Sequence, residues 1–235
     1  MVSEHLWGVV CDFDGTISKL DATDAILEAL AEPEWREIEA LWVRGAIGSR
    51  ECLERQVGCL RASENQLNAL IDGVEIDPAF SDFVSFCKRR AIPLAIVSDG
   101  LDYVIKRILE RERITGISVF ANALAAVAPA SFSISFPHAR NRCGSGVCKC
   151  AVLQHLRQLW GGRQLMFVGD GRSDFCAAAS AADFVAAKSS LLDHLLARLL
   201  PCVAYDSFSD VQSILDRLNK GLATSTRGLE HACAQ

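Results

Sequence analysis

The chain has 235 residues, half of them apolar, which is enough to bury one good hydrophobic core and a small additional unit. Its formal net charge is -5 and it has no long basic run, so nucleic acid is not expected to be its main partner. The apolar stretches are too short to cross a bilayer, and the segment MVSEHLWGVV lacks the basic start of a signal peptide. We therefore expect no membrane contact and a cytoplasmic location.

A buried strand is predicted over residues 6–11, because a short apolar run ends there in the turn sequence DFDGT. This strand delivers Asp12 and Asp14 to its carboxyl end, which is where ligands bind in open α/β sheets. Two neighbouring carboxylates repel each other unless a cation lies between them, and Mg²⁺ is the natural candidate. The pattern favours phosphate chemistry, with Asp12 as nucleophile and Asp14 as general acid and base, over the alternative of a solvated turn.

Residues 19–75 are predicted to form a small helical cap over the strand ends, because several helical segments fill a stretch too long for a plain connection. Asp21 and Asp24 stand at the start of the first of these helices. The favoured interpretation is that they cap the helix, and the alternative is that one contacts a cationic or hydroxylated leaving group. Trp35 and Trp42 share a helix face, for which core packing is favoured over an aromatic wall for the substrate.

A second strand is predicted within PLAIVSDG at residues 93–100, and a helix follows it. Ser98, Asp99 and Gly100 therefore leave the strand where a helix begins. A Ser hydroxyl and the free backbone N–H groups at such a point suit phosphate oxygens, so these three residues are candidates for binding phosphate. Ser is also a common helix cap, and that alternative stays open for Ser98.

A third strand, over residues 165–168, runs into the sequence GDGRSD. Asp170 and Asp174 lie one helical turn apart there, so one can reach a metal ion while the other supports it. The remaining predicted elements are helices over 79–91, 101–110, 151–160, 191–200 and 209–219, strands over 116–124, 130–136, 183–188 and 201–208, and a loose tail over 220–235.

The cysteines give a less specific signal. Cys143, Cys148 and Cys150 cluster in RNRCGSGVCKC, where a packed or reactive loop is favoured. Structural zinc or a disulfide is the alternative, although the usual paired CxxC spacing is missing. The other seven cysteines, Cys176 among them, are interpreted as small buried hydrophobes among apolar neighbours.

Taken together, the motifs DFDGT, VSDG and GDGRSD, with a lysine between the last two, resemble those of the haloacid-dehalogenase-like hydrolase superfamily in its phosphatase branch. The resemblance spans about the whole chain in order and spacing. It implies an α/β fold, a doubly wound parallel-sheet core of Rossmann type over residues 1–18 and 76–219, with the α-helical cap over 19–75 between them. Lys149 is our choice for the motif lysine, because it directly precedes a predicted helix, and Lys188 fits less well by position.

The resemblance also implies roles for the site residues. Asp12 would be nucleophile and Mg²⁺ ligand, Asp14 acid/base and a further ligand, and Asp170 would complete the metal site with support from Asp174. Ser98 and Lys149 would bind the transferring phosphoryl group. Since Asp14 must hold a proton near neutral pH, its surroundings should raise its pKa.

The substrate implied is a small phosphorylated metabolite. Within the superfamily the chain looks most like the methionine-salvage phosphatases, which act on a keto-pentenyl 1-phosphate. Phosphocholine/phosphoethanolamine phosphatases and phosphoserine phosphatase are the alternatives, and a phosphomutase or a non-catalytic phospho-ligand binder are rival classes. The sequence does not fix the oligomeric state.

Overall fold

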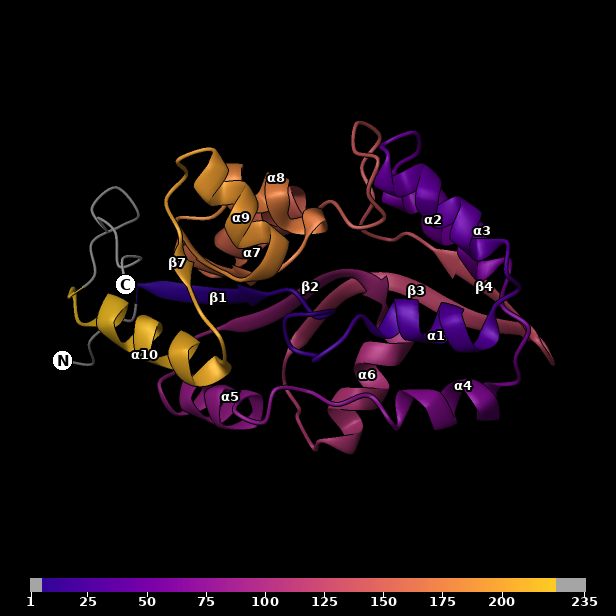
Figure 1. Ribbon diagram of the computed structural model, residues 1–235. Coiled ribbons are helices and arrows are strands. Elements are labelled where there is room, and N and C mark those ends of the chain that lie inside the picture. The colour runs from indigo at the N-terminus through magenta and orange to yellow at the C-terminus, as the bar shows by residue number, and fades with distance from the viewer. Residues whose placement is uncertain (1–5, 223–235) are drawn as a thin grey trace.

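The computed structural model describes residues 6–222, and its centre is a seven-stranded sheet (Figure 1). The strand order is β4-β3-β2-β1-β5-β6-β7. The pairs are parallel except for β3 with β4, which form an antiparallel hairpin. The strands are β1 (Trp7–Cys11), β2 (Leu94–Leu101), β3 (Ser118–Ala128), β4 (Ser131–Ser135), β5 (Gln164–Gly169), β6 (Phe184–Ala187) and β7 (Val203–Ala204).

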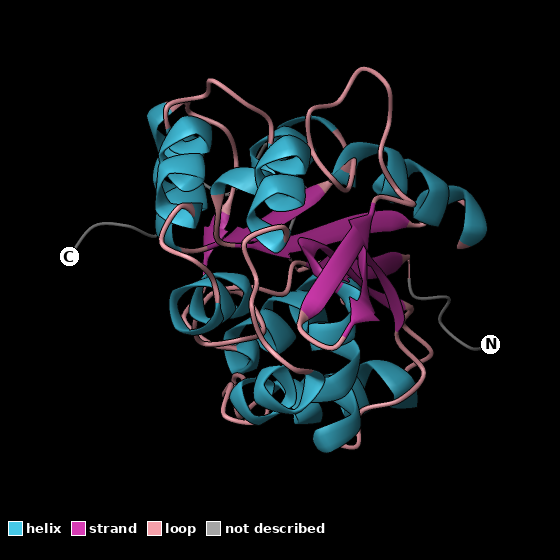
Figure 2. Ribbon diagram, turned by 90° about the vertical axis from the view of Figure 1, so that its right-hand side faces the viewer, coloured by secondary structure: helices cyan, strands magenta, loops and turns pink. Residues whose placement is uncertain are grey.

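Helices cover both faces of the sheet (Figure 2). One face carries α5 (Phe80–Arg89), α6 (Asp102–Arg111) and α10 (Phe208–Asn219), and the other carries α7 (Lys149–Leu159), α8 (Phe175–Ser180) and α9 (Ser189–Ala197). The strands divide their side chains between two separate apolar clusters: Val9 and Cys11 of β1 face the first group of helices, and Val10 faces the second. Such central strands are buried on both faces, which is why they read as continuous apolar runs.

The chain reverses direction across the sheet at β1. The chain proceeds from β1 to β2 and β3 on one side, and then returns to place β5, β6 and β7 on the other. The carboxyl ends of β1 and β5 therefore lie side by side at a topological switch point, the usual place for a ligand in an open parallel sheet.

Four helices make up the segment that precedes α5. They are α1 (Ala22–Leu30), α2 (Trp35–Val43), α3 (Ser49–Val57) and α4 (Glu64–Ile71). The segment's entry and exit lie next to each other, because Ser18 and Ile76 form an isolated antiparallel bridge. Helices α2 and α3 pack together, as do α1 and α4 (Figure 1). This arrangement agrees with a cap at 19–75, whose limits as a separate domain stay a prediction.

Some predicted boundaries differ from the structure. The strand predicted over 201–208 is wrong beyond its two paired residues, because Tyr205 and Phe208 turn into the core instead of continuing along the sheet edge. Strand β3 runs on to Ala128, because the hairpin partner β4 pairs with it there. Of the predicted tail, residues 223–235 lie outside the described part of the chain. No helix between residues 6 and 222 has the length and apolar character needed to cross a membrane.

Candidate active site

The carboxyl ends of β1, β2 and β5 open into a pocket of about 330 Å³ that the cap helices cover. From the sheet side it is lined by Asp12, Asp14, Ser98, Asp99, Gly100 and Asp170, and from the cap side by Asp21, Thr23, Asp24, Glu39, Trp42, Ser49, Cys52 and Gln56. The volume is in the range of small-molecule sites. The predicted site residues thus come together, although Lys149 and Asp174 are buried and do not line the pocket; Lys149 adjoins it through a hydrogen bond to the lining residue Ser173.

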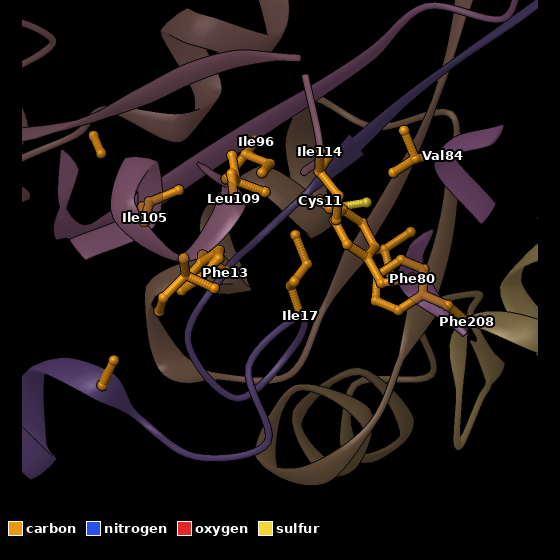
Figure 3. Close-up of a cluster of buried hydrophobic side chains, with 14 of the residues drawn as sticks. Cys11, Phe13, Ile17, Phe80, Val84, Ile96, Ile105, Leu109, Ile114 and Phe208 are labelled. Carbon is orange, nitrogen blue, oxygen red and sulfur yellow. The ribbon is translucent and has the colours of Figure 1, made fainter. Parts of the chain in front are cut away.

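The loop after β1 is fixed by its apolar residues. Phe13 and Ile17 are fully buried in the core, Phe13 on the side of Ile105 and Leu109 and Ile17 towards Phe80 (Figure 3). The Phe13 carbonyl accepts hydrogen bonds from the N–H groups of residues 16–18, which closes the turn. Gly15 has a positive φ of 69°, and a Cβ there would lie 2.4 Å from Asp170 Oδ2. The DFDGT sequence therefore anchors the loop and leaves room for a carboxylate from β5.

Lys149 lies between two buried carboxylates. Its Nζ is 2.8 Å from Asp12 Oδ1 and 2.6 Å from Asp174 Oδ1, and it donates a hydrogen bond to Ser173 Oγ at 3.1 Å. Burial opposes its charge, but the Asp12 and Asp174 carboxylates outweigh burial and raise the pKa of Lys149 above its usual value. Lys149 is thus a permanent cation against the predicted nucleophile, which is what the motif lysine should supply.

Burial and repulsion by Asp174 raise the pKa of Asp12 well above its usual value, while Lys149 lowers it. Burial and repulsion by Asp21 raise the pKa of Asp14 well above its usual value. The raised pKa predicted for Asp14 is confirmed. Asp14 Oδ1 accepts a hydrogen bond from the backbone N–H of Ala22 at 2.9 Å, at the start of the cap, so cap position and acid orientation are linked.

Three carboxylates could hold a cation. Ligand atoms of Asp12, Asp170 and Asp174 all lie within 4.8 Å of one another. Asp12 Oδ1 is buried and has the Lys149 ammonium as its neighbour at 2.8 Å, whereas both Asp174 oxygens are engaged, by Lys149 and by the N–H groups of Asp170 and Gly171. Burial and Asp174 raise the pKa of Asp170 to about 6. A hard divalent ion fits this oxygen set, with Asp12 and Asp170 as ligands and Asp174 as their support.

The carboxylate of Asp14 is not part of that trio. Its Oδ2 lies where a Cβ on Gly100 would come within 2.3 Å, next to Ser98 Oγ. Ser98 is buried and accepts a hydrogen bond from the Gly100 N–H at 3.0 Å. Glycine is required here because the acid and the strand backbone approach so closely. The role of Asp14 as a metal ligand stays a prediction.

Asp99 uses its carboxylate to join parts of the protein. Oδ1 accepts a hydrogen bond from the Val147 N–H at 2.8 Å, and Oδ2 accepts one from the Ser49 hydroxyl at the start of α3. The Asn122 amide donates to the Asp99 carbonyl at 2.6 Å. The Asp99 carboxylate would repel a phosphate. The predicted contact of Asp99 with phosphate can therefore involve only its backbone N–H, and it stays a prediction.

The cap wall is acidic. Asp21 accepts a hydrogen bond from the Asp24 N–H at 2.9 Å, so it caps α1 as favoured above, and both side chains also line the pocket. Glu39 of α2 lies on the same wall, where its Oε2 accepts a hydrogen bond from Gln56 at 2.9 Å. Burial, with repulsion by Asp21 and Glu39, raises the pKa of Asp24 to about 7.

Sequence reasoning gave no role to Glu39, Gln56 or Arg172. Arg172 stands inside the GDGRSD motif, lines the pocket and crosses to the cap, where it donates a hydrogen bond to the Val43 carbonyl at 2.6 Å. Its guanidinium lies 5.4 Å from the ring centroid of Trp42, which thus borders the pocket. The signal available was the charge of Arg172 in a loop otherwise made of small and acidic residues.

The cysteine loop contains neither a metal site nor a disulfide in the part of the chain that is described. Cys143, Cys148 and Cys150 are free thiols, and no cysteine between residues 6 and 222 belongs to a group of three possible metal ligands. The burial predicted for Cys176 is wrong: this residue is exposed, because it lies on the outer side of the short helix α8.

Comparisons with known proteins agree with this geometry. The model of a family described as putative phosphatase matches residues 8–196. The chain belongs to this family. A 2-hydroxy-3-keto-5-methylthiopentenyl-1-phosphate phosphatase of Brevibacillus brevis is 29% identical over 89% of this chain and 95% of the relative. The enzyme of the same name from Geobacillus kaustophilus is 32% identical over 88% of this chain and 94% of the relative.

Solved structures share the fold of this putative phosphatase. A phospho-aspartyl intermediate analogue of phosphoserine phosphatase superposes with a TM-score of 0.67 at 18% identity, over 88% of this chain and 97% of that one. A haloacid-dehalogenase family hydrolase from Salmonella enterica superposes with a TM-score of 0.73 at 18% identity, over 90% of this chain and 71% of that one. The predicted phosphatase is confirmed by the family match and the relatives, and the predicted α/β fold of haloacid-dehalogenase type is confirmed by the solved structures.

Proposed function

We propose that this protein hydrolyses a small phosphomonoester in a Mg²⁺-dependent reaction through an aspartyl-phosphate on Asp12. The observation that carries the proposal is the pairing of two carboxylates with different surroundings in one pocket. Asp12 lies against the Lys149 cation at 2.8 Å, whereas Asp14 points to the cap and has a strongly raised pKa. Such a pair separates a nucleophile from a general acid.

In the first step, Asp12 attacks phosphorus while Asp14 gives its proton to the oxygen of the leaving alcohol. In the second, Asp14 takes a proton from a water molecule that attacks the phosphoryl group on Asp12. Lys149 and Ser98 hold the phosphoryl oxygens throughout. Mg²⁺, held by Asp12 and Asp170, would supply positive charge against the developing negative charge.

We infer that the substrate is 2-hydroxy-3-keto-5-methylthiopentenyl-1-phosphate or a close analogue. Relatives that bear this name match nearly the whole chain. The cap wall also contains apolar surface suited to a thioether chain, from Trp42, Cys52 and Leu53. A cytoplasmic location, and the lack of nucleic-acid or membrane partners, stay predictions.

The acidic cap wall favours a second candidate. Asp21, Asp24 and Glu39 face the part of the pocket in which the leaving group would lie. Ionised carboxylates attract an ammonium or trimethylammonium group, as carried by phosphoethanolamine or phosphocholine. The two candidates differ in charge, so they can be separated by variants of this wall.

The test is phosphate release from the keto-pentenyl ester, phosphocholine, phosphoethanolamine and phosphoserine, with and without Mg²⁺. Asp12→Asn should abolish turnover, and the variant should stay folded because Lys149 keeps its second carboxylate partner, Asp174 at 2.6 Å. Asp24→Asn and Glu39→Gln should lower kcat/KM about tenfold for a cationic substrate, the effect of about 1.4 kcal/mol, and leave a neutral one unchanged. Absence of turnover on all four esters would favour a phosphomutase or a non-catalytic binder.

A further inference from the structure

The thiols of Cys150 and Cys176 lie in contact behind the candidate active site. Their Sγ atoms are 3.2 Å apart, although the residues are 26 positions apart in the chain. Cys150 is the second residue of α7 and Cys176 the second residue of α8, two helices that pack together (Figure 1). Cys176 is exposed and Cys150 half-buried, so a small oxidant can reach the pair from solvent.

The same two helix starts carry active-site residues. Lys149 immediately precedes Cys150, and Asp174 lies two residues before Cys176. Lys149 Nζ contacts Asp174 Oδ1 at 2.6 Å and Ser173 Oγ at 3.1 Å. The contact between the two sulfurs and the Lys149–Asp174 ion pair therefore join the same two segments. A change in the distance between the sulfurs would change the distance between Lys149 and Asp174.

We propose that Cys150 and Cys176 form an oxidation site, which hydrogen peroxide converts to a disulfide and which thereby turns down the adjacent active site. The effect on turnover rests on the proposed function, whereas the disulfide does not. A pair of thiols in contact, one of them exposed, is the arrangement of a reversible redox sensor in a reducing compartment.

The chemistry balances with peroxide as the only oxidant. The Cys176 sulfur attacks one peroxide oxygen, so an S–O bond forms, the O–O bond breaks and the thiol proton leaves with the departing hydroxide as water. The Cys150 sulfur then attacks the Cys176 sulfur, so the S–S bond forms, the S–O bond breaks and a second water leaves. The two thiols lose two electrons, and peroxide is reduced to water.

Disulfide formation has a structural consequence. The two sulfurs must close from 3.2 Å to the bonded distance of about 2.05 Å. Because each cysteine is in the first turn of its helix, this movement draws the starts of α7 and α8 together and shifts Lys149 against Asp12. A misplacement of about 1 Å in a catalytic group costs up to about a hundredfold in rate.

The test compares the full-length parent with Cys150→Ser, Cys176→Ser and Cys148→Ser, the last being a half-buried cysteine of the same loop as a matched control. Each protein is reduced, desalted, treated with increasing hydrogen peroxide and blocked with an alkylating agent. Intact mass and non-reducing peptide maps identify the crosslink. Phosphate release, and the Mg²⁺-induced shift of the thermal unfolding midpoint, report on the active site before and after a dithiol reductant.

The expected result is a Cys150–Cys176 crosslink in the parent and in Cys148→Ser, with turnover about tenfold or more lower, a smaller Mg²⁺ shift, and full recovery on reduction. Both single variants of the pair should form no such crosslink and keep their turnover. A map that shows Cys143 joined to Cys148, or no crosslink, overturns the proposal. So does a Cys150–Cys176 crosslink that alters neither turnover nor the Mg²⁺ shift. A reduced protein that is inactive on every ester refutes the proposed function. The peptide map and the Mg²⁺ shift would then still test whether Cys150 and Cys176 form a disulfide and whether it alters the site.

Discussion

The positive charge of Lys149 compensates the buried carboxylates of the site. This lysine is 4% exposed and has two carboxylate neighbours, Asp12 and Asp174, that are equally buried. Removing one member of a buried ion pair leaves an uncompensated charge, which costs more than the pair itself contributes. The lysine therefore has a structural role in addition to its proposed contact with phosphate.

Lys149→Met should lower the free energy of unfolding by about 3–5 kcal/mol at neutral pH without Mg²⁺, because Asp12 and Asp174 lose their cation. Urea unfolding measures this change. The matched control is Lys188→Met, at the same edge of the sheet, whose Nζ has no carboxylate of residues 6–222 in ion-pair contact and makes two weak contacts, a 3.4 Å hydrogen bond to the Thr16 carbonyl and a 5.1 Å approach to the Tyr205 ring centroid. Its loss should be below about 1 kcal/mol. Equal losses in both variants would mean that Lys149 is not the specific partner of the carboxylates.

Asp24 should make stability depend on pH. Burial raises its pKa from 3.8 to about 7, so between these values the folded protein holds a proton that the unfolded chain has lost. Stability from this group is therefore full at low pH and is lost as pH rises towards about 7. Asp24→Asn removes this pH-dependent loss of stability, because an amide does not titrate. Asp24 loses water on its pocket side but is more than a third exposed overall, and solvent screens the effect, so we expect the variant to be more stable than the parent by only about 1 kcal/mol at pH 8.

The measurement for Asp24 is urea unfolding of parent and variant at several pH values. The two free energies should converge towards pH 4, where Asp24 is protonated in both states of the parent. A difference that stays constant from pH 4 to pH 8 would show that the amide acts through packing and that the carboxylate does not titrate as described.

The acidic residues of the site could be predicted from the sequence, because each of them directly follows a strand within a turn motif. The contacts of Arg172 and Cys176 could not be predicted from the sequence. Their partners, Val43 and Cys150, are 129 and 26 residues away, so the contacts exist only once the sheet has brought the segments together.

At the scale of elements, hydrogen bonds and close backbone contacts join the cap helices α2 and α3 to the core. The Ser49 hydroxyl binds Asp99, and the Arg50 N–H donates to the Gly144 carbonyl at 3.0 Å. Arg172 reaches Val43 and Trp42. A Cβ on Gly48 would lie 2.3 Å from the Gly144 oxygen, so the two backbones touch. These contacts hold the cap against the core over the pocket, and a cap in this position limits the access of bulk water to it.

Arg172→Ala should raise KM about tenfold, because a charge-assisted hydrogen bond and a cation–π contact that favour the closed cap are lost. The matched control is Arg36→Ala, since Arg36 lies 5.2 Å from the Trp35 ring but stays within the cap, paired with Glu28. It should leave KM unchanged. Steady-state kinetics on the best ester measure both. Trp42→Leu should reproduce part of the effect; an unchanged KM in Trp42→Leu would indicate that Arg172 acts on the substrate directly.

The helical character of the cap could be predicted from its apolar spacing and from start signals such as Ser63, which forms the capping box with Gln66. Its packing could not. Helix α4 lies on the core helix α6 through the ion pair of Arg107 with Asp72, at 2.7 Å, while α2 and α3 cover the pocket. Both helix pairs have similar patterns, so the sequence does not distinguish the pair that meets the substrate.

At the scale of the whole molecule, the chain is closed by α10, which lies beyond the residues matched by the family model. Phe208, at the start of α10, is fully buried, with its ring centroid 4.8 Å from that of Phe80 and 5.2 Å from that of Phe83 (Figure 3). The helix therefore completes the core on the face of the sheet that carries α5.

Asp77 fixes this closure. Its carboxylate is buried and accepts hydrogen bonds from the Ala79 N–H at 2.8 Å and from the Phe208 N–H at 2.9 Å, across 131 residues. Asp77→Ala leaves both donors unpaired in the interior, so the free energy of unfolding should fall by about 2–4 kcal/mol. Asp210→Ala is the matched control, because Asp210 caps the same helix from solvent, accepting from the Ser207 N–H at 3.0 Å.

The control should cost about 1 kcal/mol, the usual value of an exposed cap. Urea unfolding gives both numbers, and kcat/KM below the unfolding range should stay at the parent value, because neither carboxylate lines the pocket. If Asp77→Ala were no worse than Asp210→Ala, α10 would be an appendage on an independently stable sheet. A larger loss for Asp77 than for Asp210, with activity retained, makes α10 part of the cooperative unit that positions the carboxyl ends of β1 and β5.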